Sequence, residues 1–214
     1  MRFCLVCLLL ATTHLTAQTP SKPRDPSANA ALQFWKAVAY YPTLSAEEEK
    51  IVEGWATVPL DGSVEKILSQ SQNAILFFER AAKCPYCDWG LDYNDGIELL
   101  LPHLAKARQL ARLTSLHARQ AFARGDIQTA QADAHTIAVM ARYVAQDPIM
   151  ISKLVGISME RLVIDLLAPQ ATKISTSSIT LQAQYKNLPP AATLRECILT
   201  EGKYFTPLSM VLAR

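Results

Sequence analysis

The sequence lacks a strong excess of either charge. Its 214 residues include 21 lysines and arginines against 19 aspartates and glutamates, a formal net charge of +2 with histidine neutral. A protein dedicated to nucleic acid or to an anionic membrane surface normally carries a marked basic excess. We therefore expect no nucleic-acid binding and a different kind of partner.

The motifs of several large enzyme classes are also missing. There is no His-Glu-x-x-His zinc motif, no phosphate-binding loop and no dinucleotide fingerprint. The segment GISME at residues 156–160 approaches the serine-hydrolase elbow, but Glu160 replaces its final glycine. We find no catalytic residues, metal site or cofactor signature. Whether the chain is an enzyme stays open, and we favour a non-catalytic protein.

Strand signals are scarce, and we find no apolar–polar alternating run bounded by hairpin turns. Half of the residues are apolar, enough for a sizeable core. We predict one all-α domain over residues 28–205, built as an antiparallel helical bundle or a short stack of helical hairpins. Residues 206–214 form a C-terminal tail.

The N-terminus has the layout of an export signal. Arg2 supplies the positive charge, residues 3–11 the apolar region, and we place cleavage after Ala17. The apolar run is shorter than the ~20 residues that span a bilayer, so we expect no membrane span after signal removal. We predict a signal peptide at residues 1–17, a flexible leader at 18–27, and a periplasmic or extracellular location.

Helical spacing of apolar residues predicts the elements of the domain. In the first helix, Leu32, Trp35 and Ala39 share the face expected to be buried. Ser45 and Glu48 have the spacing of a capping box. The predicted helices are residues 27–41, 45–57, 63–83, 102–124, 127–146, 149–168, 179–187 and 191–203.

The predicted helix at residues 149–168 is apolar on nearly all sides. Its charged residues are Lys153, Glu160, Arg161 and Asp165. Each of these charges would cost about 2.5–3.5 kcal/mol at the centre of a membrane helix. We therefore predict the central, buried helix of the bundle instead of a membrane span.

The segment KCPYCDWGLDYNDG, residues 83–96, contains the highest concentration of residues that could take part in chemistry. Signal removal leaves three cysteines, Cys84, Cys87 and Cys197. CPYC is the spacing of glutaredoxin-type enzymes, but there it begins a helix after a strand, and here Asp88 would oppose a thiolate. In an oxidising compartment we favour a disulfide, either Cys84–Cys87 or one of these with Cys197. Free thiols, thiol catalysis and zinc remain as alternatives.

Zinc at this loop would need two further ligands. His103, His117, His135 and Cys197 are available, but none forms a second paired motif. We therefore predict no metal site, and interpret the three histidines as polar positions at helix edges.

The rest of this loop resembles a calcium loop in the wrong register, because Gly96 is fifth from Asp92 where the sixth place is needed. We interpret the acids as turn and capping residues, and the aromatics as packing the loop onto the bundle. The candidate contacts, should the loop bind a ligand, are Asp88, Trp89, Asp92, Tyr93 and Asp95.

Three arginines, Arg108, Arg112 and Arg119, fall on one face of the predicted helix at 102–124. A solvated helix face is the favoured interpretation. The alternative is a groove for an anionic ligand.

Residues 116–148 resemble a single helical hairpin of the tetratricopeptide type. The positions that match its first helix, turn and small residue are Leu116, Phe122, Gly125, Asp126 and Ala130. The proline comes late, at Pro148, and no second copy follows at a regular period. The resemblance implies a helical hairpin more strongly than any binding function.

A wider resemblance covers residues 28–205. The segments CDWGLDY, LLPHLAKARQLARL, GD and DPIMISKLVGISME, in this order, resemble a group of exported bacterial helical proteins without an assigned function. This resemblance implies a helical fold and an exported location, and it supplies no catalytic residues.

The favoured function is therefore a non-catalytic protein-interaction or scaffold module whose partner is another protein. The alternative is a thiol-redox or metal-binding exported protein centred on the CPYC loop.

Overall fold

The computed structural model describes residues 25–174 and 185–205. Within these residues all regular elements are helices, and one isolated bridge joins Asn29 to Tyr86. The predicted all-α class is confirmed. The predicted signal peptide, most of the leader, most of the predicted helix at 179–187 and the tail lie outside the described residues.

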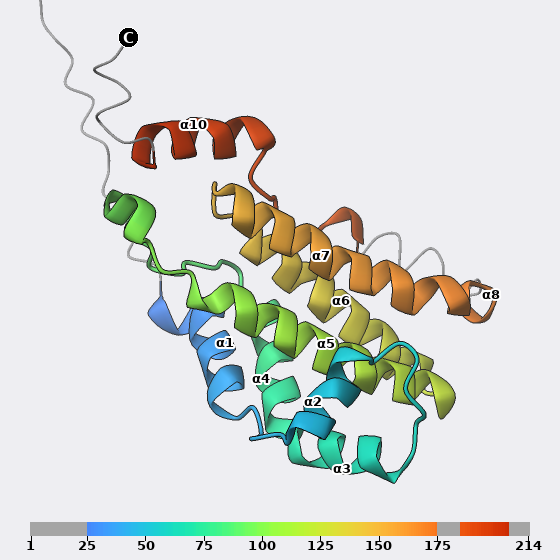
Figure 1. Ribbon diagram of the computed structural model, residues 1–214. Helices are drawn as coiled ribbons and strands as arrows, with labels where there is room; N and C mark the ends of the chain where they lie inside the picture. The colour runs from blue at the N-terminus through green and yellow to red at the C-terminus, as the bar shows by residue number, and fades with distance from the viewer. Residues whose placement is uncertain (1–24, 175–184, 206–214) are drawn as a thin grey trace, which may run out of the picture.

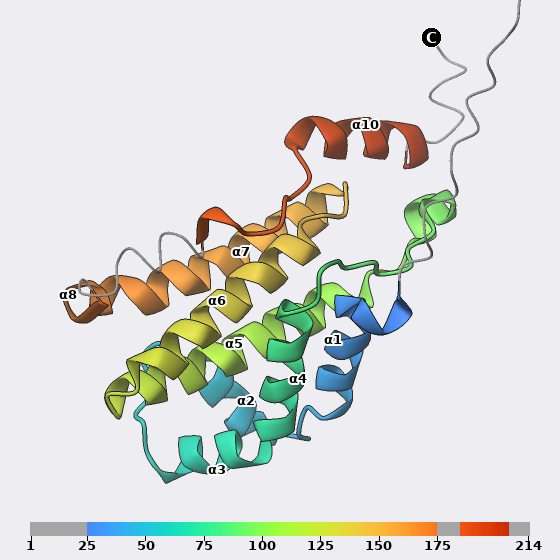
Figure 2. The same cartoon turned by 180° about the vertical axis from the view of Figure 1, so that it is seen from behind.

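Three long helices lie side by side through the length of the molecule: α5, α6 and α7 (Figure 1). The short helices α1 to α4 cover one side of α5, and α10 packs on α7 at the other end, as both views show (Figures 1 and 2). The bounds are α1 Ala30–Ala39, α2 Ala46–Glu53, α3 Gly62–Gln70, α4 Gln72–Ala82, η2 Tyr93–Glu98, α5 Pro102–Ala123, α6 Ile127–Val144, α7 Met150–Leu167, α8 Ala171–Ile174 and α10 Leu194–Tyr204.

The α5–α6 hairpin forms the centre of the fold. Pro102 begins α5. The first N–H group of a helix has no partner within the helix, so a proline at this position loses no hydrogen bond. Gly125 ends it with φ +80°, a backbone angle that favours glycine, and the Asp126 side chain then accepts from the Thr129 N–H to cap α6. The two helices bury the largest part of the core, including Leu110, Leu113 and Ile137.

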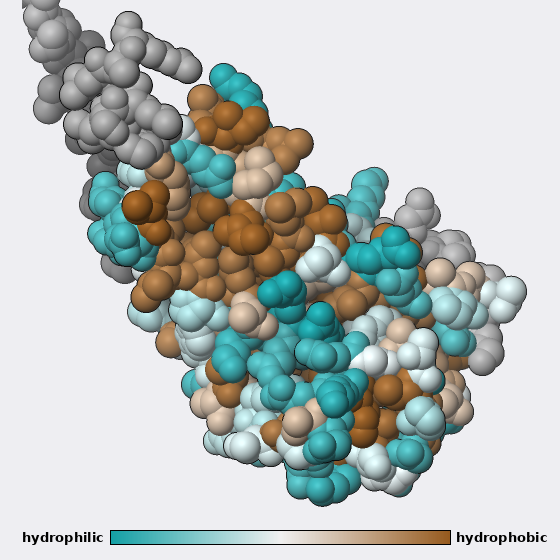
Figure 3. Space-filling model, viewed as in Figure 1, coloured by the Kyte–Doolittle hydropathy of each residue, from teal (hydrophilic) through white to brown (hydrophobic). Residues whose placement is uncertain are grey.

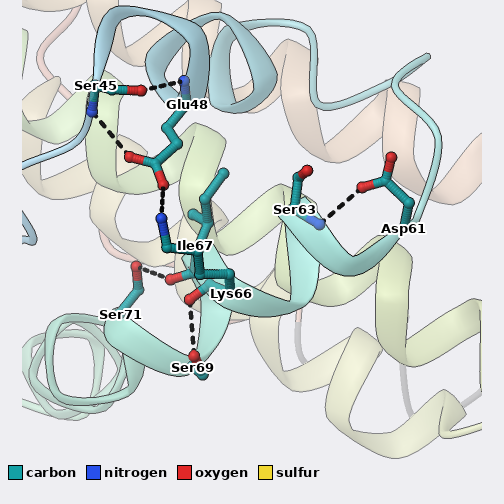
Figure 4. Close-up of polar contacts among 8 residues, drawn as sticks. All are labelled: Ser45, Glu48, Asp61, Ser63, Lys66, Ile67, Ser69 and Ser71. Carbon is teal, nitrogen blue, oxygen red and sulfur yellow. Dashed lines mark hydrogen bonds and ion pairs between the residues drawn. The ribbon is translucent and has the colours of Figure 1, made fainter.

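The predicted helix at 63–83 is wrong in one respect, because the chain breaks at Ser71 into α3 and α4. The Ser71 hydroxyl is buried and donates to the Ile67 carbonyl at 2.7 Å (Figure 4). A serine hydroxyl that competes for a backbone carbonyl in this way bends or interrupts a helix. The break lets α3 and α4 pack on different neighbours.

The predicted capping box is confirmed at the start of α2. The Glu48 N–H donates to Ser45 Oγ at 3.2 Å, and the Ser45 N–H donates to the Glu48 carboxylate at 2.9 Å (Figure 4). The same carboxylate pairs with Lys66 Nζ at 2.8 Å, which ties α2 to α3. Asp61 caps α3 by accepting from the Ser63 N–H at 2.9 Å.

The face of α1 that we expected to be buried is largely exposed. Leu32, Trp35 and Ala39 lie outward, whereas Phe34 and Ala37 are buried. Small alanines beside Phe34 let α4 approach closely. Apolar residues lie on both faces of the helix, and packing against α4 accompanies burial of the face that carries Phe34 and the alanines.

The position of α7 also differs from the prediction. It buries Val155, Met159 and Val163 against α6 and α5, but it lies at the surface and not at the centre. The reason is that α5 receives α1 to α4 on its other side, whereas no described helix covers the outer side of α7 along its length. In the parts of the chain that are described, no helix has both the length and the apolar character to cross a membrane.

Candidate functional site

Hydrogen bonds from backbone and side-chain groups hold the CPYC loop against the start of α1. The Ala30 N–H donates to the Tyr86 carbonyl at 2.8 Å. The Asn29 side chain accepts from the Asp88 N–H and donates to the Asp88 carbonyl, both at 2.9 Å. The Tyr86 hydroxyl donates to the Asp25 carbonyl at 2.9 Å. These bonds place the loop at a defined position over the ends of α1 and α4.

Behind this loop, Trp89 stacks on His103 with ring centroids 4.4 Å apart. The indole N–H of Trp89 donates to the Tyr143 carbonyl at 3.1 Å, and its edge meets Phe34. His103 is only 1% exposed, so our expectation of a helix-edge position is wrong for this residue. The aromatic stack fixes the loop to the bundle.

Asp147 lies buried beneath the same loop, in the break between α6 and α7. His103 Nε2 lies 3.2 Å from one carboxylate oxygen, and the Tyr93 hydroxyl donates to the other at 3.4 Å. Burial raises the pKa of Asp147, and the two hydrogen bonds counteract part of this rise. The sequence pattern indicated only a helix break at Asp147, and the aspartate's buried role was missed.

The cysteines of the loop are free thiols. Cys84 and Cys87 are half-buried, and Cys84 Sγ donates weakly to the Arg80 carbonyl at 3.4 Å. The Cys84 carbonyl accepts from the Tyr143 hydroxyl. Cys197 is buried in α10, which packs on α7 and η2 instead of the CPYC loop. The described part of the chain therefore contains no disulfide, contrary to our favoured prediction.

The surroundings of these thiols disfavour the thiolate. Burial raises the pKa of Cys87, and the nearby Asp147 and Asp88 carboxylates raise it further. Burial also raises the pKa of Cys84. Both thiols line a groove of about 680 Å³ with Tyr86. The groove has room for a small ligand, but its thiols are protonated at neutral pH.

Two acids of the loop accept hydrogen bonds from its backbone. Asp88 accepts from the Gly90 N–H and Asp92 from the Asn94 N–H, both at 2.9 Å. Asp95 is exposed. Among the described residues, no three His, Cys, Asp or Glu side chains are grouped to hold a metal ion.

The three candidate arginines do not converge on one groove. Arg108 and Arg112 line a groove of about 280 Å³, but Glu49 and Glu53 line it as well, and Arg112 pairs with Glu53 at 3.8 Å. Arg119 instead donates to the carbonyls of the α2–α3 link, at 2.9 Å to Trp55 and 2.6 Å to Val58. The carboxylates make this groove a poor site for an anionic ligand.

A histidine–carboxylate pair was missed by the sequence analysis. His117 of α5 lies 2.7 Å from Asp133 of α6, measured from Nδ1 to Oδ2, and Asp133 is fully buried. The hydrogen bond to Asp133 raises the pKa of His117. The signal was present, because Asp133 falls on the same helix face as the buried Ala130 and Ile137. His135, the third histidine, meets the ring of Tyr185 edge-on.

One broad surface of the molecule is apolar. Figure 3 shows a continuous apolar field over α10, the first half of α7 and the segment that leads into α5. We call this surface the apolar face. The large aliphatic side chains exposed on these segments are Ile97, Leu100, Ile151, Leu154, Ile157, Leu194, Ile198 and Leu199.

Comparison of the chain with models of protein families, with curated proteins and with solved structures finds no match. The two resemblances drawn from the sequence therefore stay predictions.

Proposed function

We propose that this chain is an exported, non-catalytic interaction module that binds another protein through the apolar face. The observation that carries the proposal is the outer side of α7. The helix has the apolar composition of a fully buried helix, yet Leu154 is 54% exposed and Ile151 and Ile157 are each 49% exposed. Large contiguous apolar patches on soluble proteins mark interaction sites.

The face is held in place before any partner arrives. Glu201 of α10 accepts from the Met150 N–H at 2.7 Å and so caps the start of α7. Lys153 of α7 donates to the Ala192 carbonyl at 2.7 Å, just before α10. A surface that needs little ordering on binding loses less conformational entropy, which favours affinity.

The area can support a protein partner. Full burial of one Leu or Ile side chain contributes about 1.5–3 kcal/mol, and half-exposed side chains supply a fraction of that each. Eight large aliphatic side chains are exposed on α7, on α10 and in the segment before α5. We expect the partner to present a complementary apolar surface, such as one side of an amphipathic helix.

The test begins with a photo-crosslinking amino acid at Leu154, in the cell that makes the protein. The control position is Asn73, an exposed polar residue of α4, across α5 from α7. The cross-linked protein is identified by mass, purified and titrated against the chain. We expect Leu154→Glu to weaken its binding by about 30-fold or more, the loss typical of an interface hot spot, and Asn73→Glu to leave it unchanged.

Two results would overturn the proposal. One is cross-linking at position 154 no stronger than at position 73. The other is equal affinity of the purified partner for the native chain and for Leu154→Glu.

The alternative prediction, a thiol-redox or metal-binding protein, has weaker support. The raised pKa values of Cys84 and Cys87 oppose the thiolate that both chemistries need. The shared groove beside the two thiols is the observation in its favour. Intact mass after alkylation, together with a metal assay on the same sample, separates the two functions.

A further inference from the structure

The outer side of α7 carries a row of side chains that suits pairing with another helix of the same kind. Leu154, Ile157 and Ile164 are 54%, 49% and 60% exposed, and exposed Arg161 lies between the last two. The intervals along this row are three, four and three residues. Paired helices have this spacing along their contact, and a single polar residue in such a row fixes how the two helices align.

The charged side chains of α7 already have partners within the chain. Arg161 pairs with Asp165 at 2.8 Å, and Glu160 forms an ion pair with Arg142 at 2.8 Å. Lys153 donates to the backbone just before α10 at 2.7 Å. None of these charges calls for an opposite charge on the partner, so the row selects a partner that is apolar where it touches.

A second copy of the chain meets this requirement, because it presents the same apolar row. The formal net charge of the chain is only +2, so two copies repel each other weakly. A two-fold interface uses one patch on both copies, and therefore a single apolar face is sufficient for it.

The apolar area is in the range that a stable dimer needs. The eight large aliphatic side chains exposed on α7, on α10 and in the segment before α5 are 49% to 80% exposed. They offer roughly 300–600 Å² of apolar area to a partner. Homodimer interfaces are about 65% apolar, so this area corresponds to an interface of roughly 450–900 Å² on each copy. Stable interfaces begin at about 600 Å² on each copy.

We propose that the partner of the apolar face is a second copy of this chain, and that the two copies pair about a two-fold axis through their α7 helices. This inference rests on the proposed function and specifies its partner. The row at Leu154 and Ile157 of one copy packs on the same row of the other. On each copy, α10 and the segment before α5 flank this contact (Figure 3).

Symmetry sets the size of the expected effect, because a substitution is present twice in such a dimer. Leu154→Glu places a carboxylate within an apolar contact. A dimer of one native and one Leu154→Glu chain should dissociate about 30-fold more readily than the native dimer, and a dimer of two variant chains about 1,000-fold more readily. Asn73→Glu is the matched control, since Asn73 is exposed on α4, across α5 from α7.

The test is sedimentation equilibrium of the chain purified from the cell that makes it. We expect the native chain and Asn73→Glu to dimerise with a dissociation constant in the micromolar range or tighter. Leu154→Glu should be monomeric at the same concentrations. A native chain that stays monomeric well above micromolar concentration, or equal dimerisation of Leu154→Glu, would overturn the inference.

Unfolding gives a second measurement, because association stabilises a folded chain by mass action. The midpoint of urea unfolding should rise with protein concentration for the native chain and stay constant for Leu154→Glu. In dilute solution, where the native chain is monomeric, the two should unfold at the same urea concentration. A native midpoint that is independent of concentration would contradict the dimer.

The photo-crosslinking amino acid at position 154 separates this inference from the proposed function. A product with twice the mass of the chain supports both. A product with a different protein, together with a monomeric native chain, would overturn the second copy as the partner and leave the proposed function standing. Cross-linking at position 154 no stronger than at position 73 would overturn both.

Discussion

Two aspartates are buried against histidine rings, and both pairs use the central helix α5. His117 bonds Asp133 of α6, and His103 bonds Asp147 at the end of α6. Carboxylates are rarely buried without a partner, because desolvation disfavours their charged form. The His117–Asp133 bond joins α6 to α5, and the His103–Asp147 bond joins the link between α6 and α7 to α5.

The His117–Asp133 pair makes stability depend on pH. The folded-state pKa of His117 lies above its ordinary value of 6.5, so the folded chain holds this proton more tightly. The contribution of this pair to the free energy of unfolding is full below the unfolded-state pKa of His117. It is lost as pH rises through the folded-state pKa of His117. Urea unfolding across roughly pH 6 to 9 should show this decline in the native chain, and His117→Gln should make it shallower. An unchanged slope in the variant would contradict the assignment.

Cysteine reactivity is predicted to follow burial and nearby charge. Cys84 should react first with iodoacetamide, Cys87 more slowly because Asp147 and Asp88 oppose its thiolate, and buried Cys197 last. All three should react more slowly than a free cysteine at the same pH. Peptide mass spectrometry at timed intervals measures this order, with the unfolded chain as the control. Faster reaction of Cys87 than of free cysteine would favour the thiol-redox alternative.

At the scale of elements, α6 and α7 approach each other closely at Gly156. A Cβ added there would lie 2.7 Å from the Ala145 Cβ and 2.8 Å from the Ala141 carbonyl oxygen. The GISME segment thus serves close packing through its glycine. The near-match to a hydrolase elbow lies within a helix.

Gly156→Ala is predicted to force α7 away from α6 and to lower the free energy of unfolding by about 1–3 kcal/mol. The matched control is Gly202→Ala in α10, where an added Cβ would meet nothing within 4 Å. That change should be neutral or should stabilise by up to about 1 kcal/mol, because alanine is the better helix former. Urea unfolding of both variants checks the contrast, and equal effects would refute it.

Helix ends were more predictable than helix faces. The starts of α5 and α6 match the prediction, since Pro102, Gly125 and Asp126 act through their own backbone and side chains. The break at Ser71 was missed, because a serine inside a helix pattern interrupts it only where its hydroxyl takes the backbone carbonyl. The buried face of α1 was wrong because both faces carry apolar residues, and contact with α4 decides between them.

At the scale of the whole molecule, the core and the apolar face should respond oppositely to substitution. Leu113 is fully buried, so Leu113→Ala should lower the free energy of unfolding by about 2–5 kcal/mol. Leu154 is half-exposed, so Leu154→Glu should change it by less than about 0.5 kcal/mol and reduce binding of a hydrophobic dye. Urea unfolding and dye fluorescence measure the two effects. A large loss of stability in Leu154→Glu would mean that α7 belongs to the core.

The candidate sites were harder to predict than the fold. The composition of the CPYC loop suggested a chemical site, but Trp89 packs on the bundle, and Asp88 and Asp92 accept hydrogen bonds from nearby backbone N–H groups. The groove of about 410 Å³ that His117 and Gln120 line gave no motif, because α5 supplies these two residues and the earlier helices α3 and α4 supply most of the remaining lining. Such a site becomes visible only when the helices are placed.

The sequence by itself determined the helical class, most helix boundaries and the capping box at Ser45, because these depend on the spacing and backbone chemistry of neighbouring residues. Tertiary structure alone decided that α5 and α6 form the centre, that no described helix covers the outer side of α7, and that Asp133 and Asp147 are buried. The physical reason is that helical periodicity gives a helix an apolar side, whereas burial depends on which distant segment packs against that side.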